Sequence, residues 1–588
     1  MPVAESLTLL ELPEGQVEFG GMRIRFPWCT RLKDGQLNGF RMPRFDLADD
    51  PWVPLWSTDG ARSRECSVRE ALTRAQDFGG LDTDIPTQVP AILRQVLLPV
   101  VAAALGRPAD GQDWLRRFGQ GRFSEAECAR LGAYLDEHRD SFDLFSQDRP
   151  FAQVAGLRTG KGDTKSAVLM VATESSGNNV PLFSNRTEGD VLSLTPAQAA
   201  RWLLHTHCWD TAAIKTGVVG DPRVKAGKTM ANPTGPLGQL GVVLPVGRTL
   251  YETLLLNLPV GAGPESDVPQ WHRSAGHAGF AGSPRWQVRS AAGLLDLWTW
   301  QARRVRLVPV QTPDGVRVER VIVAAGDRMA VLPDLEPHTT WNLEPKKTPP
   351  QRPRRHQPGQ NGWRGMKALL AGTGGEPDGE KTASSRLLVQ LRDLRTRLPT
   401  GYPLQVHLTG ITYGTQSSVV DNIFCDTIPL PVAALDPSTG AYRTVLGAAE
   451  RADNLAKAVN TLSADLRRAA GGDPIPWDRG QRPGDQLLHA LDLPVRRLLC
   501  GVQQTGEDQA TLTRGLLAWE QTAYLIAHRL ADALISQTPA TAFLGRTAGG
   551  RRYRQGTAER AFRIRVNTIL SLAAEVRREA RNGTGAGS

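Results

Sequence analysis

The sequence has few cysteines and histidines, and their spacing argues against metal centres. Six cysteines are scattered along 588 residues without a CxxC pair or a regular interval, and the ten histidines are equally dispersed. Zinc sites and disulfide frameworks need closely or regularly spaced cysteines. We therefore expect no structural metal, no cofactor and a reducing, cytoplasmic location.

Segments that direct a chain into or across a membrane are also lacking. The first 15 residues contain three glutamates and no apolar block, unlike a signal peptide. The most apolar long run, residues 89–105, contains Arg94 and Pro99 and is short for a membrane span, so it predicts a buried helix. We expect no membrane partner.

Recognisable catalytic motifs are absent as well. Pro222 stands where a phosphate-binding loop would need a glycine, so AGKTM at 226–230 is not such a loop. His205 and His207 are two positions apart and would point to different sides of a helix, so they cannot share a metal ion. We expect no catalytic residues and a protein that is not an enzyme. The alternative is a nucleic-acid-modifying enzyme whose active site is dispersed in sequence.

What the chain does have is positive charge. The net charge is +10, and basic residues gather in KKTPPQRPRRHQPGQNGWRGMK at 346–367, in RTAGGRRYRQGTAER at 546–560, and at Arg563 and Arg565 just beyond it. The prolines of the first segment predict a basic loop with little local order. Several basic runs in one chain without a catalytic motif point to phosphate backbones as partners.

The order of patterns predicts an α+β fold with a mixed α/β part followed by helices. Capping-box spacings start helices after Ser67, Ser124 and Thr195, the last running from 196 to about 214. Alternating apolar residues around a Pro-Asp-Gly turn predict a hairpin at 304–326, and a strand pair follows at 403–431.

Beyond Pro431 the pattern is helical to the end. Four segments, 441–470, 484–503, 507–537 and 557–580, predict a four-helix bundle. We divide the chain into an N-terminal extension of unknown role at 1–44, a mixed α/β domain at 45–431 and an all-α bundle at 432–588.

Six segments, taken in order, resemble a known family, that of CasA, the large subunit of the type I-E CRISPR Cascade surveillance complex. They are FDLADDPWVPL, DLFSQDRPFAQ, SGNNVPLFSN, AAIKTGVVGDPRVKAGK, DLWTWQARRVRLV and YGTQSSVVD. The resemblance implies a non-catalytic subunit that checks a short protospacer-adjacent motif (PAM) in double-stranded DNA, helps open the duplex for pairing with guide RNA, and recruits a helicase-nuclease. It also implies reading from the minor groove, whose hydrogen-bonding pattern is degenerate.

The resemblance assigns roles to two loops and one lysine position. A hairpin carries a glutamine wedge that enters beside the PAM, a Gly/Lys loop approaches the minor groove, and one lysine near 346 reads the groove. The wedge hairpin residues are Thr415, Gln416 and Ser417, and the groove residues are Gly217, Gly220, Lys225, Gly227, Lys228, Lys346 and Lys347. Without the resemblance, residues 413–418 would be an ordinary hairpin turn.

The polar loop at 173–190 raises a separate question. The residues alone favour Phe183 as an anchor that pins the loop to its own domain, and the alternative is a contact loop for a nucleic acid or a partner subunit. The resemblance instead implies contact with the crRNA handle and backbone subunits. The residues of that contact are Asn179, Phe183, Ser184 and Asn185, and Arg551, Arg552 and Arg554 are assigned to the target-strand backbone. The implied partners are crRNA, duplex DNA, the backbone, handle-binding and small subunits, and the helicase-nuclease.

Overall fold

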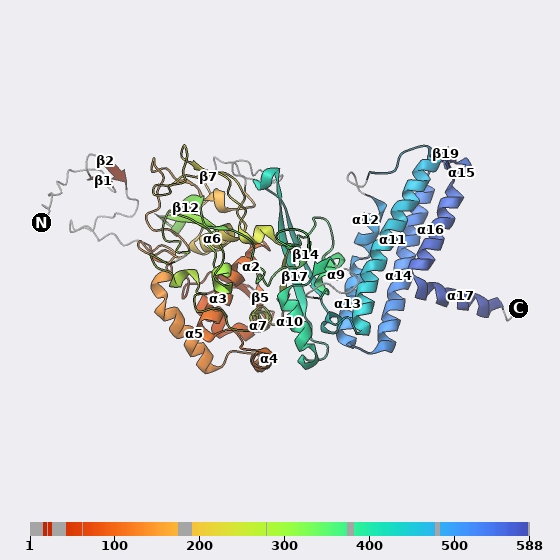
Figure 1. Cartoon of the computed structure of the whole chain (residues 1–588), viewed down its shortest axis with the longest axis horizontal. Coiled ribbons are helices and arrows are strands. Elements are labelled where there is room, and N and C mark those ends of the chain that lie inside the picture. The colour runs from red at the N-terminus through yellow and green to blue at the C-terminus, as the bar shows by residue number, and fades with distance from the viewer. Residues whose placement is uncertain are drawn as a thin grey trace.

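The chain forms a mixed α/β unit and a helical bundle that lie side by side, as Figure 1 shows. The α+β prediction is confirmed. The computed structural model describes residues 16–19, 22–25, 43–60, 63–174, 191–277, 279–372, 381–476 and 482–585, with the side chains of 16–25 and 581–585 left out. Most of the predicted N-terminal extension and the whole contact tip at 179–185 therefore lie outside the described residues.

The three helix starts predicted from capping residues are confirmed. The Ser67 and Thr195 side chains accept from the backbone N–H three residues on, and Ser124 and Thr195 both complete a reciprocal capping box. The helix that starts at Pro196 ends at Trp209, whereas the sequence predicted an end near 214. The next residue, Asp210, leaves the helical conformation and pairs with Lys215. The helices of this unit are α1 (Val68–Thr73), α2 (Gln88–Ile92), α3 (Leu98–Leu105), α4 (Gly111–Gln120), α5 (Glu125–Glu137), α6 (Pro196–Trp209), α7 (Leu250–Leu256), α8 (Leu294–Trp298), α9 (Met366–Leu369) and α10 (Arg386–Leu394).

The apolar run is a core helix, as predicted. Within the described residues, Gln88–Leu105 is the helix long and apolar enough to cross a membrane, but 83% of that window is buried inside the protein. A π-helical turn at Leu93–Leu97 joins α2 to α3. It carries Arg94, which donates two hydrogen bonds of 2.7 and 2.8 Å to the buried Glu336 carboxylate. The charge inside the apolar run is thus paired in the core.

Two sheets position the candidate site. One has the order β11-β12-β7-β8, and the other has the order β18-β17-β9, in which the predicted hairpin β17–β18 pairs antiparallel along its whole length. The predicted hairpin at 304–326 is β11–β12. The strands are β3 (Val53–Ser57), β4 (Arg64–Cys66), β5 (Phe78–Leu81), β6 (Lys165–Ser166), β7 (Lys215–Thr216), β8 (Lys228–Thr229), β9 (Val242–Val246), β10 (Val288–Arg289), β11 (Arg303–Thr312), β12 (Gly315–Ala325), β13 (Arg328–Met329), β14 (Trp341–Leu343), β15 (Gln351–Pro353), β16 (Thr382–Ala383), β17 (Gln405–Gly414) and β18 (Val419–Pro429), after an N-terminal pair, β1 (Gln16–Phe19) and β2 (Met22–Arg25).

The prediction of a basic loop with little local order at 346–367 is wrong in part, since 346–350 and 354–361 are loop but the rest forms regular elements. Strand β15 pairs with β14, and a 3₁₀ turn at Gly362–Gly365 leads into α9. Trp363 is fully buried, and its indole Nε1 donates to Asp492 Oδ1 at 2.9 Å. Composition could not predict this order, because the hydrogen bond between the buried Trp363 and Asp492 joins two segments far apart in the chain.

The bundle begins with the 31-residue α11 (Gly440–Ala470). Two of the four predicted helices are each broken in two, at Leu491 and at Leu570. Pro494 accounts for the first break because it lacks a backbone N–H. At the second, the buried Glu520 carboxylate accepts from the Ala573 backbone N–H at 3.0 Å and so starts a new helix. The remaining elements are α12 (Pro483–Ala490), α13 (Asp492–Thr505), α14 (Gln509–Ser536), α15 (Thr541–Leu544), β19 (Arg546–Ala548), β20 (Arg551–Tyr553), α16 (Gln555–Ile569) and α17 (Ser571–Gly585).

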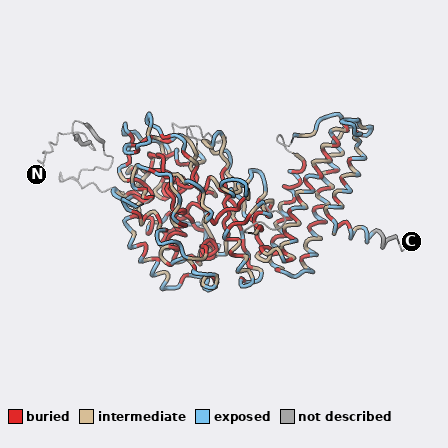
Figure 2. The backbone as a smooth tube through the Cα atoms, viewed as in Figure 1, coloured by how far each residue is buried: buried red, intermediate tan, exposed pale blue. Residues whose placement is uncertain are grey.

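Polar contacts fasten the bundle to the α/β unit. Arg496 of α13 pairs with Asp426 of β18 at 2.7 Å, and Arg364 pairs with Asp453 of α11 at 2.9 Å. Figure 2 shows buried residues running through the α/β unit and along the inner faces of the bundle helices, and a single hydrophobic cluster includes residues of both parts. The hairpin β17–β18 lies between them (Figure 1) and contacts each.

Candidate nucleic-acid interface

The turn of the β17–β18 hairpin presents Gln416 to solvent. Thr415 and Gln416 are exposed and Ser417 is half-buried. Within the described residues, the Gln416 side chain makes no hydrogen bond, whereas the backbone around it is held. Ser417 O accepts from Ala212 N at 2.8 Å, and the Tyr413 hydroxyl donates to Trp209 O at 2.6 Å. The backbone of this turn is therefore fixed, while the side-chain amide of Gln416 has no hydrogen-bond partner among the described residues.

The same turn has an unusual backbone. Thr415, Gln416 and Ser417 have φ angles of +26°, +56° and +60°, which residues with a Cβ rarely adopt. Each costs about 1 kcal/mol relative to a right-handed conformation. The contacts with Trp209 and Ala212 keep the turn in this form, and strain held by surrounding contacts is a common property of functional sites.

The predicted Gly/Lys loop is a short hairpin. β7 and β8 pair antiparallel, and Lys225 and Lys228 exchange backbone hydrogen bonds of 2.9 and 3.0 Å across a two-residue turn. Ala226 and Gly227 in that turn both have positive φ, 48° and 72°, as in the turns that match strand twist. We call residues 215–229 the Gly/Lys hairpin.

Glycine is required at one position of this hairpin for steric reasons. A Cβ on Gly217 would lie 2.5 Å from Val224 Cγ1 and 2.7 Å from the Gly227 carbonyl carbon. Gly220 and Gly227 have positive φ instead. Lys225 and Lys228 are exposed, and within the described part of the chain no carboxylate pairs with either of them. The hairpin thus presents two free ammonium groups on a slim backbone.

A buried ion pair anchors the base of the Gly/Lys hairpin. Lys215 Nζ lies 2.6 Å from Asp210 Oδ2, and Arg303 also donates to that carboxylate. Burial lowers the pKa of Lys215 to about 8, against the opposing effect of Asp210. Burial acts to raise the pKa of Asp210, but Lys215 and Arg303 outweigh it and lower that pKa to about 2. The pair remains charged in both partners near pH 7.

The turn at 415–417 and the base of the Gly/Lys hairpin line one groove. A cavity of about 900 Å³ is lined by Thr415 and Gln416 on one side and by Lys215 and Thr216 on another. Its walls also contain Lys165 and Arg320, together with the exposed apolar side chains of Leu169 and Ile214. Two elements that lie about 200 residues apart in the chain therefore meet at a basic, partly apolar groove.

Lys165 and Arg320 were missed by the sequence interpretation. They come from β6 and β12, which pair with each other, so Arg320 sits opposite Ser166. Arg320 Nε donates to Thr164 Oγ1 at 2.9 Å, which directs it along the groove wall. Neither residue lies in a basic run, and only the pairing of distant strands brings them together.

Other predicted residues lie elsewhere. Lys346 and Lys347 are exposed in the turn between β14 and β15, where Lys347 Nζ pairs with Glu344 at 3.0 Å, and neither lines the groove. Arg551, Arg552 and Arg554 belong to or flank the β19–β20 hairpin at the far end of the bundle (Figure 1). Asn179, Phe183, Ser184 and Asn185 lie outside the described residues.

The cluster at 205–208 is structural. His205 bonds to Thr87 Oγ1 at 3.0 Å, His207 Nε2 donates to Ala152 O at 2.9 Å, and Cys208 Sγ accepts from Gln95 at 3.1 Å. The three side chains face different partners. Among the described residues, no group of three or more His, Cys, Asp or Glu side chains is arranged to hold a metal ion.

The sequence matches the family described as CRISPR-associated protein Cse1 over residues 46–530. The chain belongs to this family. It is similar to the CRISPR-associated protein CasA/Cse1 of Thermus thermophilus, with 29% identity over 470 residues that cover 78% of this chain and 85% of the relative. The resemblance inferred from six short segments is thereby confirmed.

Solved structures of Cse1 proteins share the fold. Cse1 from Thermobifida fusca has a TM-score of 0.75 and 31% identity, covering 90% of this chain and 99% of that one. Cse1 from Acidimicrobium ferrooxidans has a TM-score of 0.74 and 31% identity, covering 90% and 98%. A chain from a structure described as a CRISPR RNA-guided surveillance complex has the same fold at 20% identity and a TM-score of 0.62, covering 84% and 99%.

Proposed function

We propose that this Cse1-family chain is the non-catalytic large subunit of a type I-E Cascade complex. In this role it recognises the PAM in duplex DNA, starts strand separation for crRNA pairing and recruits a helicase-nuclease in the cytoplasm. The observation that carries the proposal is the shared groove, which brings the unpaired Gln416 amide beside the base of the Gly/Lys hairpin. Family membership and the surveillance-complex chain of the same fold support it.

Gln416 suits a wedge for physical reasons. Separating stacked base pairs costs a few kcal/mol per step, so a wedge must be rigid and must offer new partners to the freed bases. The backbone of residues 415–417 is held by Trp209 and Ala212, and the amide has both a donor and an acceptor. Gln416 is therefore placed to enter beside the PAM without first breaking an internal hydrogen bond.

The Gly/Lys hairpin suits the minor groove, which is about 6 Å wide in B-DNA. A two-residue turn of alanine and glycine is narrow enough to approach its floor, and Lys225 and Lys228 provide charge for the flanking phosphates. Lys165 and Arg320 would then contact the backbone of a strand that enters the groove. Lys346 and Lys347 are assigned to DNA near the PAM, and the bundle arginines to the target strand.

The proposal is tested by binding of a reconstituted, guide-loaded complex to matched duplex DNA at fixed salt, because phosphate contacts make affinity salt-dependent. Gln416→Ala is expected to slow duplex opening by roughly tenfold or more, as the cost of unstacking implies. It should leave binding to a target with a pre-opened bubble unchanged. Gln311→Ala is the matched control, since Gln311 is also exposed beside a hairpin turn but does not line the groove.

The results on duplex and bubble targets distinguish a wedge from a general DNA contact at Gln416. Loss of opening for Gln416→Ala but not for Gln311→Ala supports the wedge. An equal loss on duplex and bubble would assign Gln416 to general binding, and full binding in the absence of the whole subunit would overturn the proposal. Metal-dependent nuclease activity of the isolated chain would favour the dispersed-site enzyme instead.

A further inference from the structure

Asp221 joins three parts of the structure at the Gly/Lys hairpin. Its carboxylate is buried and accepts from Arg223 N at 2.9 Å, within the hairpin, and from Thr229 Oγ1 at 3.4 Å, in β8. It also accepts from Trp286 Nε1 at 3.0 Å, and Trp286 lies outside the hairpin. One carboxylate thus ties the first half of the hairpin to its second half and to a separate segment.

Trp286 contacts the hairpin a second time through arginine side chains. The guanidinium carbons of Arg223 and Arg328 each lie 4.0 Å from the indole ring centroid. Arg223 belongs to the hairpin, and Arg328 Nη2 donates to Met230 O at 2.8 Å, directly after β8. Pro284, two residues before Trp286, packs 3.4 Å from the position of a Cβ on Gly220. Trp286 therefore braces the first half of the hairpin directly and the residue after β8 through Arg328.

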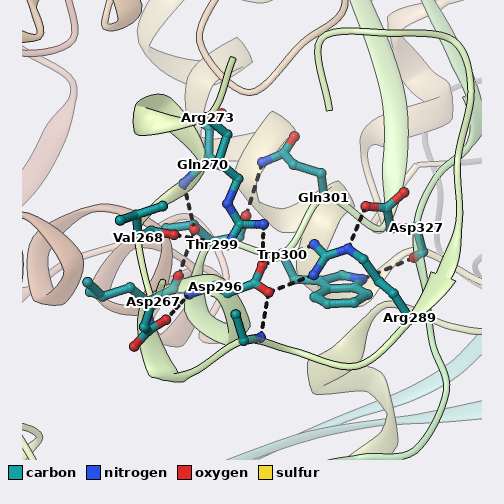
Figure 3. A network of polar contacts seen from close by, with 12 residues as sticks. Asp267, Val268, Gln270, Arg273, Arg289, Asp296, Thr299, Trp300, Gln301 and Asp327 are labelled. Carbon is teal, nitrogen blue, oxygen red and sulfur yellow. Dashed lines mark hydrogen bonds and ion pairs between the residues drawn. The ribbon is translucent and has the colours of Figure 1, made fainter. Parts of the chain in front are cut away.

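Trp286 itself rests on a buried ionic network, part of which Figure 3 shows. Arg304 donates to the carbonyl oxygens of Ser283 and Arg285 and pairs with Asp327 at 2.7 Å. Arg289 then bridges Asp327 and Asp296 at 3.1 and 2.6 Å. A set of paired charges that is largely shielded from solvent fixes the backbone that carries Trp286.

We propose that Trp286 and Asp221 are positioning residues for DNA recognition by the Gly/Lys hairpin. The inference rests on the proposed function, because it concerns the same hairpin. Neither side chain touches DNA. They hold the turn of Ala226 and Gly227 in a fixed position and orientation relative to the duplex. Its backbone can then form hydrogen bonds with the base edges of a PAM but not with those of a non-PAM sequence. A loosely held turn would still attract phosphates but would lose this discrimination.

The physical basis is the difference between charge and geometry. Attraction between lysines and phosphates tolerates movement of about an ångström or more, whereas hydrogen bonds to base edges do not. A binding site whose residues are not held in a fixed geometry loses specificity before it loses affinity. The brace should therefore act on the ratio between PAM and non-PAM binding, and much less on non-specific binding.

Trp286→Phe is the decisive variant. It keeps an aromatic ring for Arg223 and Arg328 and removes the Nε1 donor to Asp221. Trp114→Phe is the matched control, since Trp114 is also buried and loses one indole donor, to Leu255 O at 2.8 Å, away from the hairpin. Hydrogen exchange of the subunit in its assembled complex is expected to rise about tenfold at 215–229 in Trp286→Phe and not in Trp114→Phe.

A second arm measures DNA recognition. For Trp286→Phe, the ratio of affinities for PAM and non-PAM duplexes should fall about tenfold, while the salt dependence of non-PAM binding stays unchanged. Asp221→Ala should reduce the ratio at least as much, because it also removes the contacts with Arg223 N and Thr229 Oγ1. Adding Trp286→Phe to Asp221→Ala should change the ratio little further, since the hydrogen bond between the two side chains is already lost. Lys225→Ala with Lys228→Ala tests the hairpin itself and should weaken binding to both duplexes.

The outcomes separate the two proposals. If the lysine variants weaken binding and Trp286→Phe changes neither exchange nor discrimination, the brace is overturned and the hairpin keeps its function. If Trp286→Phe raises exchange but not discrimination, the brace is structural only and the inference is also overturned. If the lysine variants have no effect on DNA binding, the proposed function of the hairpin fails and the inference fails with it.

Discussion

Two basic hairpins have the same kind of two-residue turn but differ in how firmly the surrounding structure holds them. The Gly/Lys hairpin turns at Ala226 and Gly227, and the β19–β20 hairpin turns at Gly549 and Gly550, all four residues with positive φ. The first extends a sheet and is braced from outside. The second forms a two-stranded sheet of its own, where Tyr553 contacts Arg468 and Arg551, each 5.3 Å from the ring centroid.

This difference separates recognition by geometry from recognition by charge. A braced hairpin holds its backbone still enough to meet base edges. The β19–β20 hairpin pairs with no further strand that the structure describes and carries four exposed arginines, Arg546, Arg551, Arg552 and Arg554. It is therefore suited to phosphates, whose attraction does not need close placement. Under the proposed function, specificity would come from the α/β unit and general affinity from the end of the bundle.

The largest expected effect is on the acid stability of the unit that holds the braced hairpin. Burial lowers the pKa of His205 to about 3 and the pKa values of His207 and His338 to about 4. The unfolded chain takes up protons as pH falls through about 6.5, but the folded state does not until pH nears 4, so stability falls with pH over this window. Between pH 7.5 and 5.5 the loss is about 1.4 kcal/mol per histidine.

Region-resolved hydrogen exchange in urea at both pH values measures this loss. The bundle is the internal control, because its His528 is only half-buried, although its pKa is also lowered by burial. The α/β unit should lose at least about 4 kcal/mol, since burial also lowers the pKa values of its His272 and His356 to about 4, and the bundle should lose much less. Equal losses in both regions would show that the two unfold as one unit and that the difference between the hairpins does not extend to stability.

Alanine at one glycine in each hairpin gives the next largest effect. Gly217→Ala should destabilise the Gly/Lys hairpin by at least about 2 kcal/mol, since its Cβ would meet backbone atoms of Gly227. Gly549→Ala meets nothing within 4 Å and is opposed only by its positive φ of 55°, which costs about 1 kcal/mol. PAM-dependent binding should be lost in the first variant and kept in the second. Similar binding defects in both would contradict the division of roles.

The smallest effect concerns salt dependence. Arg551→Ala and Arg552→Ala should each reduce the slope of log affinity against log salt by about 1, uniformly across target sequences. Arg130→Ala is the matched control, since Arg130 is an exposed arginine on α5, in the α/β unit and away from the bundle (Figure 1), and its loss should leave the slope unchanged. A change in PAM preference for the bundle variants would mean that the β19–β20 hairpin also reads sequence.

Local patterns predicted the elements well. Capping residues at Ser67, Ser124 and Thr195 place helix starts correctly because each cap bonds within its own first turn. The β17–β18 hairpin follows from alternation for the same reason. The prediction for 346–367 failed at the end of the segment, since Trp363 donates to Asp492, more than a hundred residues away. Breaks in two bundle helices were likewise missed, although Pro494 was visible in the sequence.

The sequence by itself determined the family, the fold class, and the choice of Gln416 and the Gly/Lys hairpin as candidates for DNA contact, because these depend on short motifs and local periodicity. Only the tertiary structure decided that Gln416 and Lys215 face one groove, that Lys165 and Arg320 join them, and that Trp286 braces the hairpin. These relations depend on contacts between segments far apart in the chain, whose geometry is fixed by strand pairing and core packing rather than by any local pattern.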